Sequence, residues 1–107
     1  MITGSVANKY PQRRHHIKVR SKLLNATGKV AKSKDVYAGN LISDKDLQTL
    51  SIQEIDNRLM NRFGRNDINT NILPNSSIPL MIVFGDLPED LQEFTVEAIS
   101  SSREPVS

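Results

Sequence analysis

The sequence contains no cysteine, which excludes a disulfide framework, a zinc site built from thiolates and a cysteine nucleophile. It has no long hydrophobic run either: the longest, Leu80–Phe84, is far shorter than the roughly 20 residues that a membrane-spanning helix needs. The first residues contain no apolar stretch of the kind found in a secretory signal peptide. We therefore expect no membrane partner, and an intracellular location or one within a virion or ribonucleoprotein particle.

Acidic residues are absent from the first 34 positions, which hold nine lysine and arginine residues. The rest of the chain holds five basic residues and all twelve acids, so the net charge of +2 conceals a strongly basic part and an acidic part. Like charges repel one another, and the basic part has few large apolar residues. The pattern predicts an irregular, extended basic arm over residues 1–40. An alternative is that Ile17–Arg20, where apolar and basic residues alternate, forms a strand of a self-contained fold.

The clearest local pattern indicates a helix over residues 52–63. Ser51 and Glu54 have the spacing of a capping box, in which each side chain can satisfy the other residue's backbone N–H. Gly64 is a typical helix stop. Apolar residues follow the cap at spacings of three and four, on one face of the predicted helix; they are Ile52, Ile55, Leu59 and Phe63.

A buried strand is predicted over residues 80–84, because this run is short, continuously apolar and preceded by a proline. Pro79 cannot donate a ladder hydrogen bond, so we expect it at the strand's first position. A single strand cannot form a sheet. It therefore requires a partner strand from the arm, from the loop over residues 66–78 or from another chain.

A second helix is predicted over residues 88–99, with Asp86 as a cap, Pro88 at the first helical position and acids in the first turn. The alternative is a short helix to Gln92 followed by a strand, since Phe94, Val96 and Ala98 also alternate with polar residues. With the helix preferred, the fold class is a small α+β body over residues 41–99, flanked by the arm and by a polar tail over 100–107.

No motif indicates catalysis or a cofactor. His15 and His16 are adjacent, and adjacent side chains of an extended chain point to opposite sides, so we expect no metal site. A catalytic triad would need one of them as its base, and their cationic surroundings oppose the imidazolium that forms. The glycines are isolated, so no phosphate-binding loop can be assembled. We therefore predict that the chain is not an enzyme and has no cofactor.

The small core and the lone apolar strand favour a non-catalytic structural or assembly subunit whose partners are protein subunits of a larger complex. The expected apolar docking residues are Ile52, Ile55, Leu59, Phe63, Leu80, Ile82 and Phe84. An alternative is a nucleic-acid-binding accessory protein, because clustered cations bind phosphates in a salt-dependent way. The residues expected on nucleic acid or an acidic protein surface are Arg13, Arg14, Lys18, Arg20, Lys22, Lys29, Lys32 and Lys34.

Overall fold

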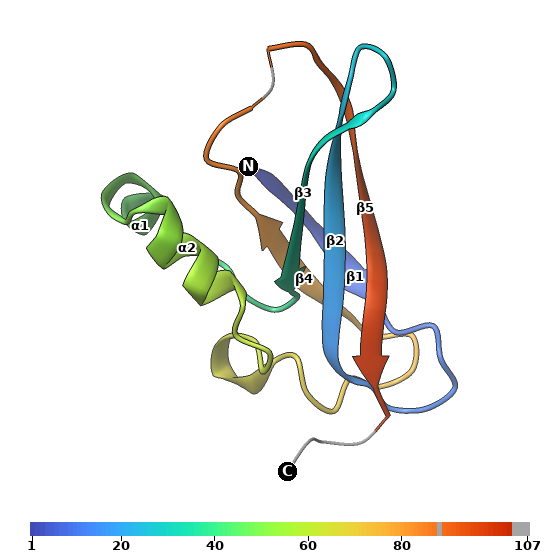
Figure 1. Cartoon of the computed structure of the whole chain (residues 1–107). Helices are drawn as coiled ribbons and strands as arrows, with labels where there is room; N and C mark the ends of the chain where they lie inside the picture. Colours follow the sequence, from blue (N-terminus) through green and yellow to red (C-terminus); the bar gives the residue numbers. More distant parts are fainter. Residues whose placement is uncertain (88, 104–107) are drawn as a thin grey trace.

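The computed structural model describes residues 1–87 and 89–103. Strands account for 44% of the structure and helices for 17%, so the fold is mostly β. Figure 1 shows β2 in the middle of one sheet, with β3 and β5 beside it and β1 and β4 behind. The elements are β1 (Ile2–Ala7), β2 (His15–Asn25), β3 (Val30–Tyr37), α1 (Asp44–Thr49), α2 (Ile52–Leu59), the 3-10 helix η1 (Arg65–Asp67), β4 (Ser77–Ile82) and β5 (Leu91–Ser102).

The strand β2 is the centre of the three-stranded sheet, since it pairs antiparallel with both β3 and β5. Its side chains alternate between two faces, as the pleat of a strand requires. Val19 and Leu23 lie on the buried face together with Ser21. The opposite face of β2 carries the basic residues Lys18, Arg20 and Lys22.

The prediction of an irregular basic arm is wrong, because residues 1–40 contain β1, β2 and β3. The repulsion within the basic segment is offset by acids from neighbouring strands. The Arg20 guanidinium donates two hydrogen bonds to the Asp35 carboxylate, at 2.8 and 3.0 Å, and this contact lowers the pKa of Asp35. The Lys22 ammonium lies 3.9 Å from the Glu97 carboxylate. The rejected alternative, a strand at Ile17–Arg20, is closer to the structure.

The prediction of a helix over residues 88–99 is also wrong, and with it the α+β fold class. Residues 91–102 form β5, in which Phe94 lies opposite Leu23 and Val96 lies opposite Ser21. The period of two at Phe94, Val96 and Ala98 therefore prevails over the helical spacing, because β2 provides a ladder for it. Pro88, which was expected in the first turn of the helix, lies outside the described residues.

The first half of the predicted body is closer to expectation, with different boundaries. The Ser51 hydroxyl accepts the Glu54 N–H at 3.2 Å, and α2 begins directly after this cap. The helix ends at Leu59 and does not reach Phe63. The strand β4 begins at Ser77, so Pro79 lies inside it, and the Pro79 carbonyl accepts a hydrogen bond from the Gly39 N–H at 2.7 Å.

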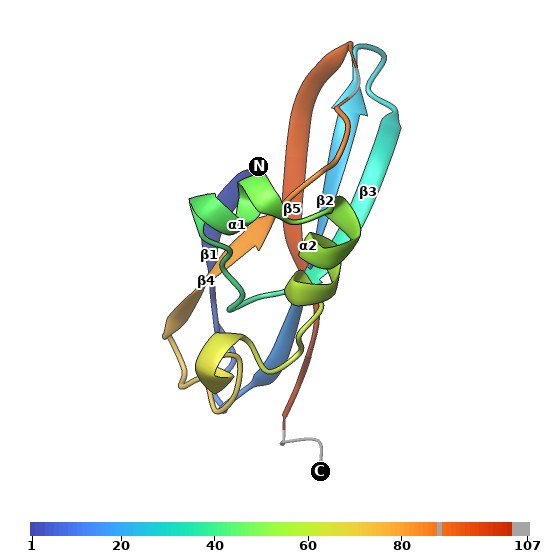
Figure 2. The same cartoon turned by 90° about the vertical axis from the view of Figure 1, so that its left-hand side faces the viewer.

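The core lies between the two sheets, and α1 and α2 cover the side near β3 and β4 (Figure 2). The partner strand of β4 comes from the same chain, because β1 pairs with it antiparallel. The fully or nearly fully buried apolar side chains are Ile17, Val19, Leu23, Val36, Ala38, Ile42, Ile55, Leu59, Ile72, Ile78, Leu80, Met81 and Ile82.

A buried asparagine holds the loop after η1 against β2. The Asn69 side chain has no exposed surface; its oxygen accepts the Ile17 N–H at 2.9 Å and its amide donates to the Ile17 carbonyl at 3.0 Å. These are the two hydrogen bonds that a neighbouring strand would make. The amide side chain thus substitutes for a strand at the point where β2 enters the core.

We predict that Asn69→Ala lowers the free energy of unfolding by about 2 kcal/mol, because it leaves the buried N–H of Ile17 without a partner. The Ile17 carbonyl loses one of its two hydrogen bonds and keeps the one from the Ala38 N–H, at 3.0 Å. Denaturant unfolding of the whole chain measures this change. The matched control is Asn57→Ala, at an exposed position in α2, for which we expect a change within about 0.5 kcal/mol. Equal effects of the two substitutions would contradict the role given to Asn69.

Candidate functional site

The basic residues expected to form one binding surface lie in separate places. Lys18, Arg20 and Lys22 are on the outer face of β2, whereas Lys32 and Lys34 lie opposite residues of its buried face. The remaining three are in the loops at either end of β2: Arg13 and Arg14 before it, and Lys29 in the turn to β3. The structure does not bring the eight together, and binding of nucleic acid or of an acidic surface stays a prediction.

Lys34 is a basic residue whose side chain makes contacts within the folded chain. Its ammonium group donates to the Asp56 carboxylate of α2 and to the Val83 carbonyl, both at 2.7 Å. It also lies 5.4 Å from the centre of the Phe84 ring. Lys34 therefore connects β3 to α2 and to the segment that follows β4.

Replacing this lysine should weaken the fold measurably. We expect Lys34→Met to lower the free energy of unfolding by about 1 kcal/mol, since the charged hydrogen bonds are partly screened by water. Urea unfolding at low and high salt measures the loss, which should shrink as salt screens the pair. Lys29→Met, in the exposed turn, is the control, and a Lys34→Met loss no larger than that of the control would contradict this account.

The apolar residues expected to dock on a partner are mostly part of the core. Of the helix residues, Ile55 and Leu59 are buried, while Ile52 and Phe63 are 41% and 38% exposed. In and after β4, Leu80 and Ile82 are buried and Phe84 is partly buried. The seven residues form no continuous exposed surface.

The two adjacent histidines are both buried at the start of β2. The His15 Nδ1 accepts the Asn71 N–H at 2.7 Å, and the His16 Nδ1 lies 2.9 Å from the Arg62 carbonyl. Burial lowers the pKa of His15, and the charges of His16, Arg13 and Arg14 lower it further. Residues 1–87 and 89–103 contain no group of three or more histidine and acidic side chains placed to hold a metal ion.

The lowered pKa predicts a loss of stability in acid. The lowered pKa favours the neutral form of His15 in the folded chain, whereas in the unfolded chain the pKa of His15 is the ordinary value of about 6.5. The unfolded chain therefore binds more protons, and the free energy of unfolding falls as the pH drops below about 6.5. In urea titrations across this range, His15→Asn should have a flatter pH dependence than the parent, because the amide oxygen accepts the same N–H without titrating. Identical slopes would contradict this assignment.

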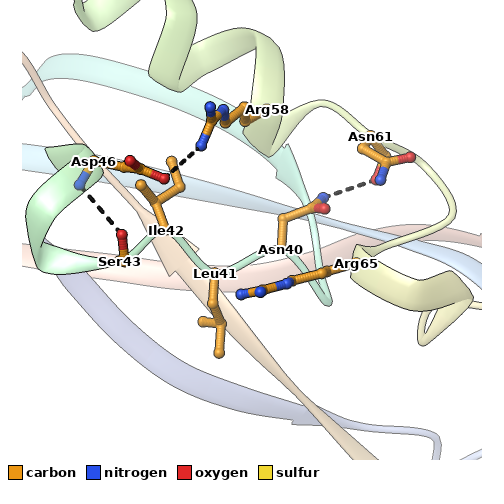
Figure 3. A pocket seen from close by; sticks show the side chains of 8 residues that line it. All are labelled: Asn40, Leu41, Ile42, Ser43, Asp46, Arg58, Asn61 and Arg65. Atoms are coloured by element: carbon orange, nitrogen blue, oxygen red, sulfur yellow. Dashed lines mark hydrogen bonds and ion pairs between the residues drawn. The ribbon is translucent and has the colours of Figure 1, made fainter. Parts of the chain in front are cut away.

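A pocket of about 470 Å³ lies between α1, α2 and η1 (Figure 3). Arg58 and Arg65 reach into it from different elements, and the Arg58 guanidinium is paired with Asp46 at 2.8 Å. Leu41 and Ile42 supply its apolar surface. One of the two guanidinium groups is therefore paired with a carboxylate of the lining itself. The lining residues include no histidine or cysteine.

The more extensive feature is the strand β5, which pairs with β2 on one edge and has no neighbour in its sheet on the other, within the described part of the chain. Phe94 and Val96 lie opposite residues of the buried face of β2, and yet they are 54% and 38% exposed. Both views show why: the first half of β5 extends beyond β1 and β4, which cover the core elsewhere (Figures 1 and 2). This free edge with its uncovered apolar side chains is the candidate site.

The two halves of β5 have different surroundings. A small groove of about 100 Å³ separates the second half, from Ala98 to Ser101, from the end of β1. The Arg14 guanidinium donates to the Ser101 hydroxyl at 2.7 Å and to the Ser101 carbonyl at 2.9 Å, so this end is tied to the preceding loop. The accessible part of the edge is therefore the stretch from Leu91 to Glu97.

The outer face of β5 carries acids where its core-facing side carries apolar residues. Glu93, Thr95 and Glu97 alternate with Phe94 and Val96, and both glutamates are exposed. The predicted helix over residues 88–99 conceals this site, because a helix there would leave no strand edge. The pattern that indicates the strand is the alternation at Phe94, Val96 and Ala98, on which the alternative prediction of a strand was based.

The comparisons with known proteins identify a family without a described activity. A family model described as "Protein of unknown function (DUF3426)" matches residues 1–98, which include all the elements from β1 to β4 and most of β5. No curated protein and no solved structure matches the chain. Within the described residues, no helix has both the length and the apolar character needed to cross a membrane. Because the matching model covers most of the chain, the protein belongs to the DUF3426 family.

Proposed function

We propose that the protein is a non-catalytic assembly domain that binds an extended segment of another protein along the free edge of β5. The observation that supports this most is the exposure of Phe94 and Val96 on the side of the sheet that is otherwise buried. A strand added beside β5 would pair with its unpaired backbone groups and cover these side chains. Addition of a strand to an exposed sheet edge is a common mode of peptide recognition.

The energetics require both kinds of contact. Each backbone hydrogen bond of an added strand contributes only about 1 kcal/mol net. Burial of an aromatic or branched apolar side chain contributes roughly 1.5–3 kcal/mol. Since association costs at least about 4 kcal/mol in lost freedom, the ladder alone gives weak binding. Phe94 and Val96 therefore determine whether the edge binds a partner stably.

This proposal keeps the predicted class of function and replaces the predicted docking surface. The residues of α2 and β4 that were expected to dock on a partner stabilise the core between the two sheets. The burial of Ile55, Leu59, Leu80 and Ile82 indicates this. Exposing them would require the fold to open. The edge of β5 is accessible without any such rearrangement.

Site-specific photo-cross-linking tests the proposal in the cells that make the protein. A photoreactive phenylalanine analogue at position 94 should yield a discrete adduct with another protein, and the mass of the linked peptide should identify the segment. The same analogue at Met60, an exposed position at the end of α2, is the control and should yield no such adduct. Val96→Asp, which places a charge on the apolar side, should reduce the adduct formed at position 94.

A negative result of the cross-linking would contradict the proposal, provided that the labelled chains are folded. If circular dichroism shows that the labelled chains are folded, and position 94 gives no protein adduct or the same adducts as position 60, the edge of β5 is not a protein-binding site.

A further inference from the structure

We infer that the segment bound by β5 alternates apolar and basic residues; this inference rests on the proposed function and specifies the partner. The two faces of β5 carry different side chains. In an antiparallel ladder, side chains directly opposite each other lie on the same face of the sheet. An added strand would therefore place every second side chain beside Phe94 and Val96, and the others beside Glu93 and Glu97.

The two faces select different side chains. The apolar side of β5 is exposed at Phe94 and Val96, so it gains from apolar neighbours that exclude water. The Glu97 side chain on the other side is 58% exposed, and Glu93 is also exposed. Opposite charges across a ladder stabilise the pairing and like charges destabilise it, so the second set of partner side chains should be basic.

The sheet already contains one strand with this pattern on the other edge of β5. In β2, Val19, Ser21 and Leu23 alternate with basic residues. Leu23 lies opposite Phe94, and the Lys22 ammonium reaches Glu97 at 3.9 Å. The partner proposed for the free edge therefore has the same chemistry as the neighbour that β5 pairs with inside the fold.

A second copy of the chain does not match this pattern. Antiparallel pairing of two β5 strands would bring Glu93 and Glu97 of both copies onto one face, where the carboxylates repel. The other edge strand of this sheet, β3, carries Asp35 on its outer face, whereas its Lys32 and Lys34 lie on the opposite face. The strands β1 and β4 contain no basic residue. The charges thus favour a different protein over self-association.

The length of the segment follows from the accessible part of the edge. From Leu91 to Glu97, β5 offers a ladder before the groove beside β1 begins. A segment of about seven residues spans this stretch at the usual rise of a strand. Three or four of its side chains would be apolar and three basic.

A synthetic peptide tests the inference directly. The probe is a capped, fluorescent peptide of about seven residues in which valine and lysine alternate, and its anisotropy is measured during titration with the whole chain. We expect it to bind at least about tenfold more tightly than the matching valine–glutamate peptide, because two attractive cross-strand pairs replace two repulsive ones. N-methylation of alternate residues of the probe should abolish binding, since it removes the backbone donors of the ladder.

Charge reversal of the strand provides the decisive comparison. The double variant Glu93→Lys, Glu97→Lys should prefer the valine–glutamate peptide. Asp44→Lys, Asp67→Lys changes the net charge equally at exposed positions outside β5 and should keep the original preference. If the β5 variant is folded by circular dichroism and still prefers the lysine peptide, or if the parent chain shows no preference, the inference is wrong. In that case an adduct at position 94 would still support the proposed function, with a partner of other chemistry.

Discussion

The alternation of apolar and basic residues along β2 is the constraint on which the rest of the structure depends. It requires each neighbouring strand to place an acid opposite Arg20 on one face and an apolar side chain opposite Val19 on the other. β3 meets this requirement with Val36 and Asp35, and β5 with Ala98 and Glu97. The separation of charge along the sequence thus becomes complementarity across the sheet. An isolated basic segment would repel itself, whereas paired with acids from later in the chain it forms the central strand.

This explains which parts of the fold could be predicted from sequence. The start of α2 was predictable because its cap involves only Ser51 and Glu54, three residues apart. The role of β2 was not, because the acids that offset its charge lie on other strands. The segment at β5 matches two periods, and local pattern cannot choose between them. Only the ladder with β2 makes the period of two the stable one.

The candidate site was mispredicted for a related reason. The apolar strand β4 looked incomplete because its partner, β1, lies at the other end of the sequence and contains only short or small side chains apart from Ile2 and Val6. Once β1 supplies that partner, the predicted docking residues become core. Buried asparagines such as Asn69 then hold the long loops, a role that no periodicity reveals. Within residues 1–87 and 89–103, one edge of β5 stays without a neighbouring strand in its sheet.

The acids of β5 have two consequences that belong together. A long exposed edge without lysine or proline invites pairing between identical chains, and inward or flanking charges are one way in which proteins prevent it. Glu93 and Glu97 provide such charges. They also favour one kind of partner strand, because basic side chains opposite them would be attracted instead of repelled. The same two carboxylates therefore disfavour pairing between copies of this chain and favour pairing with a strand that carries basic side chains. Specificity of this kind needs both the attraction and the repulsion, and β5 carries the groups for each.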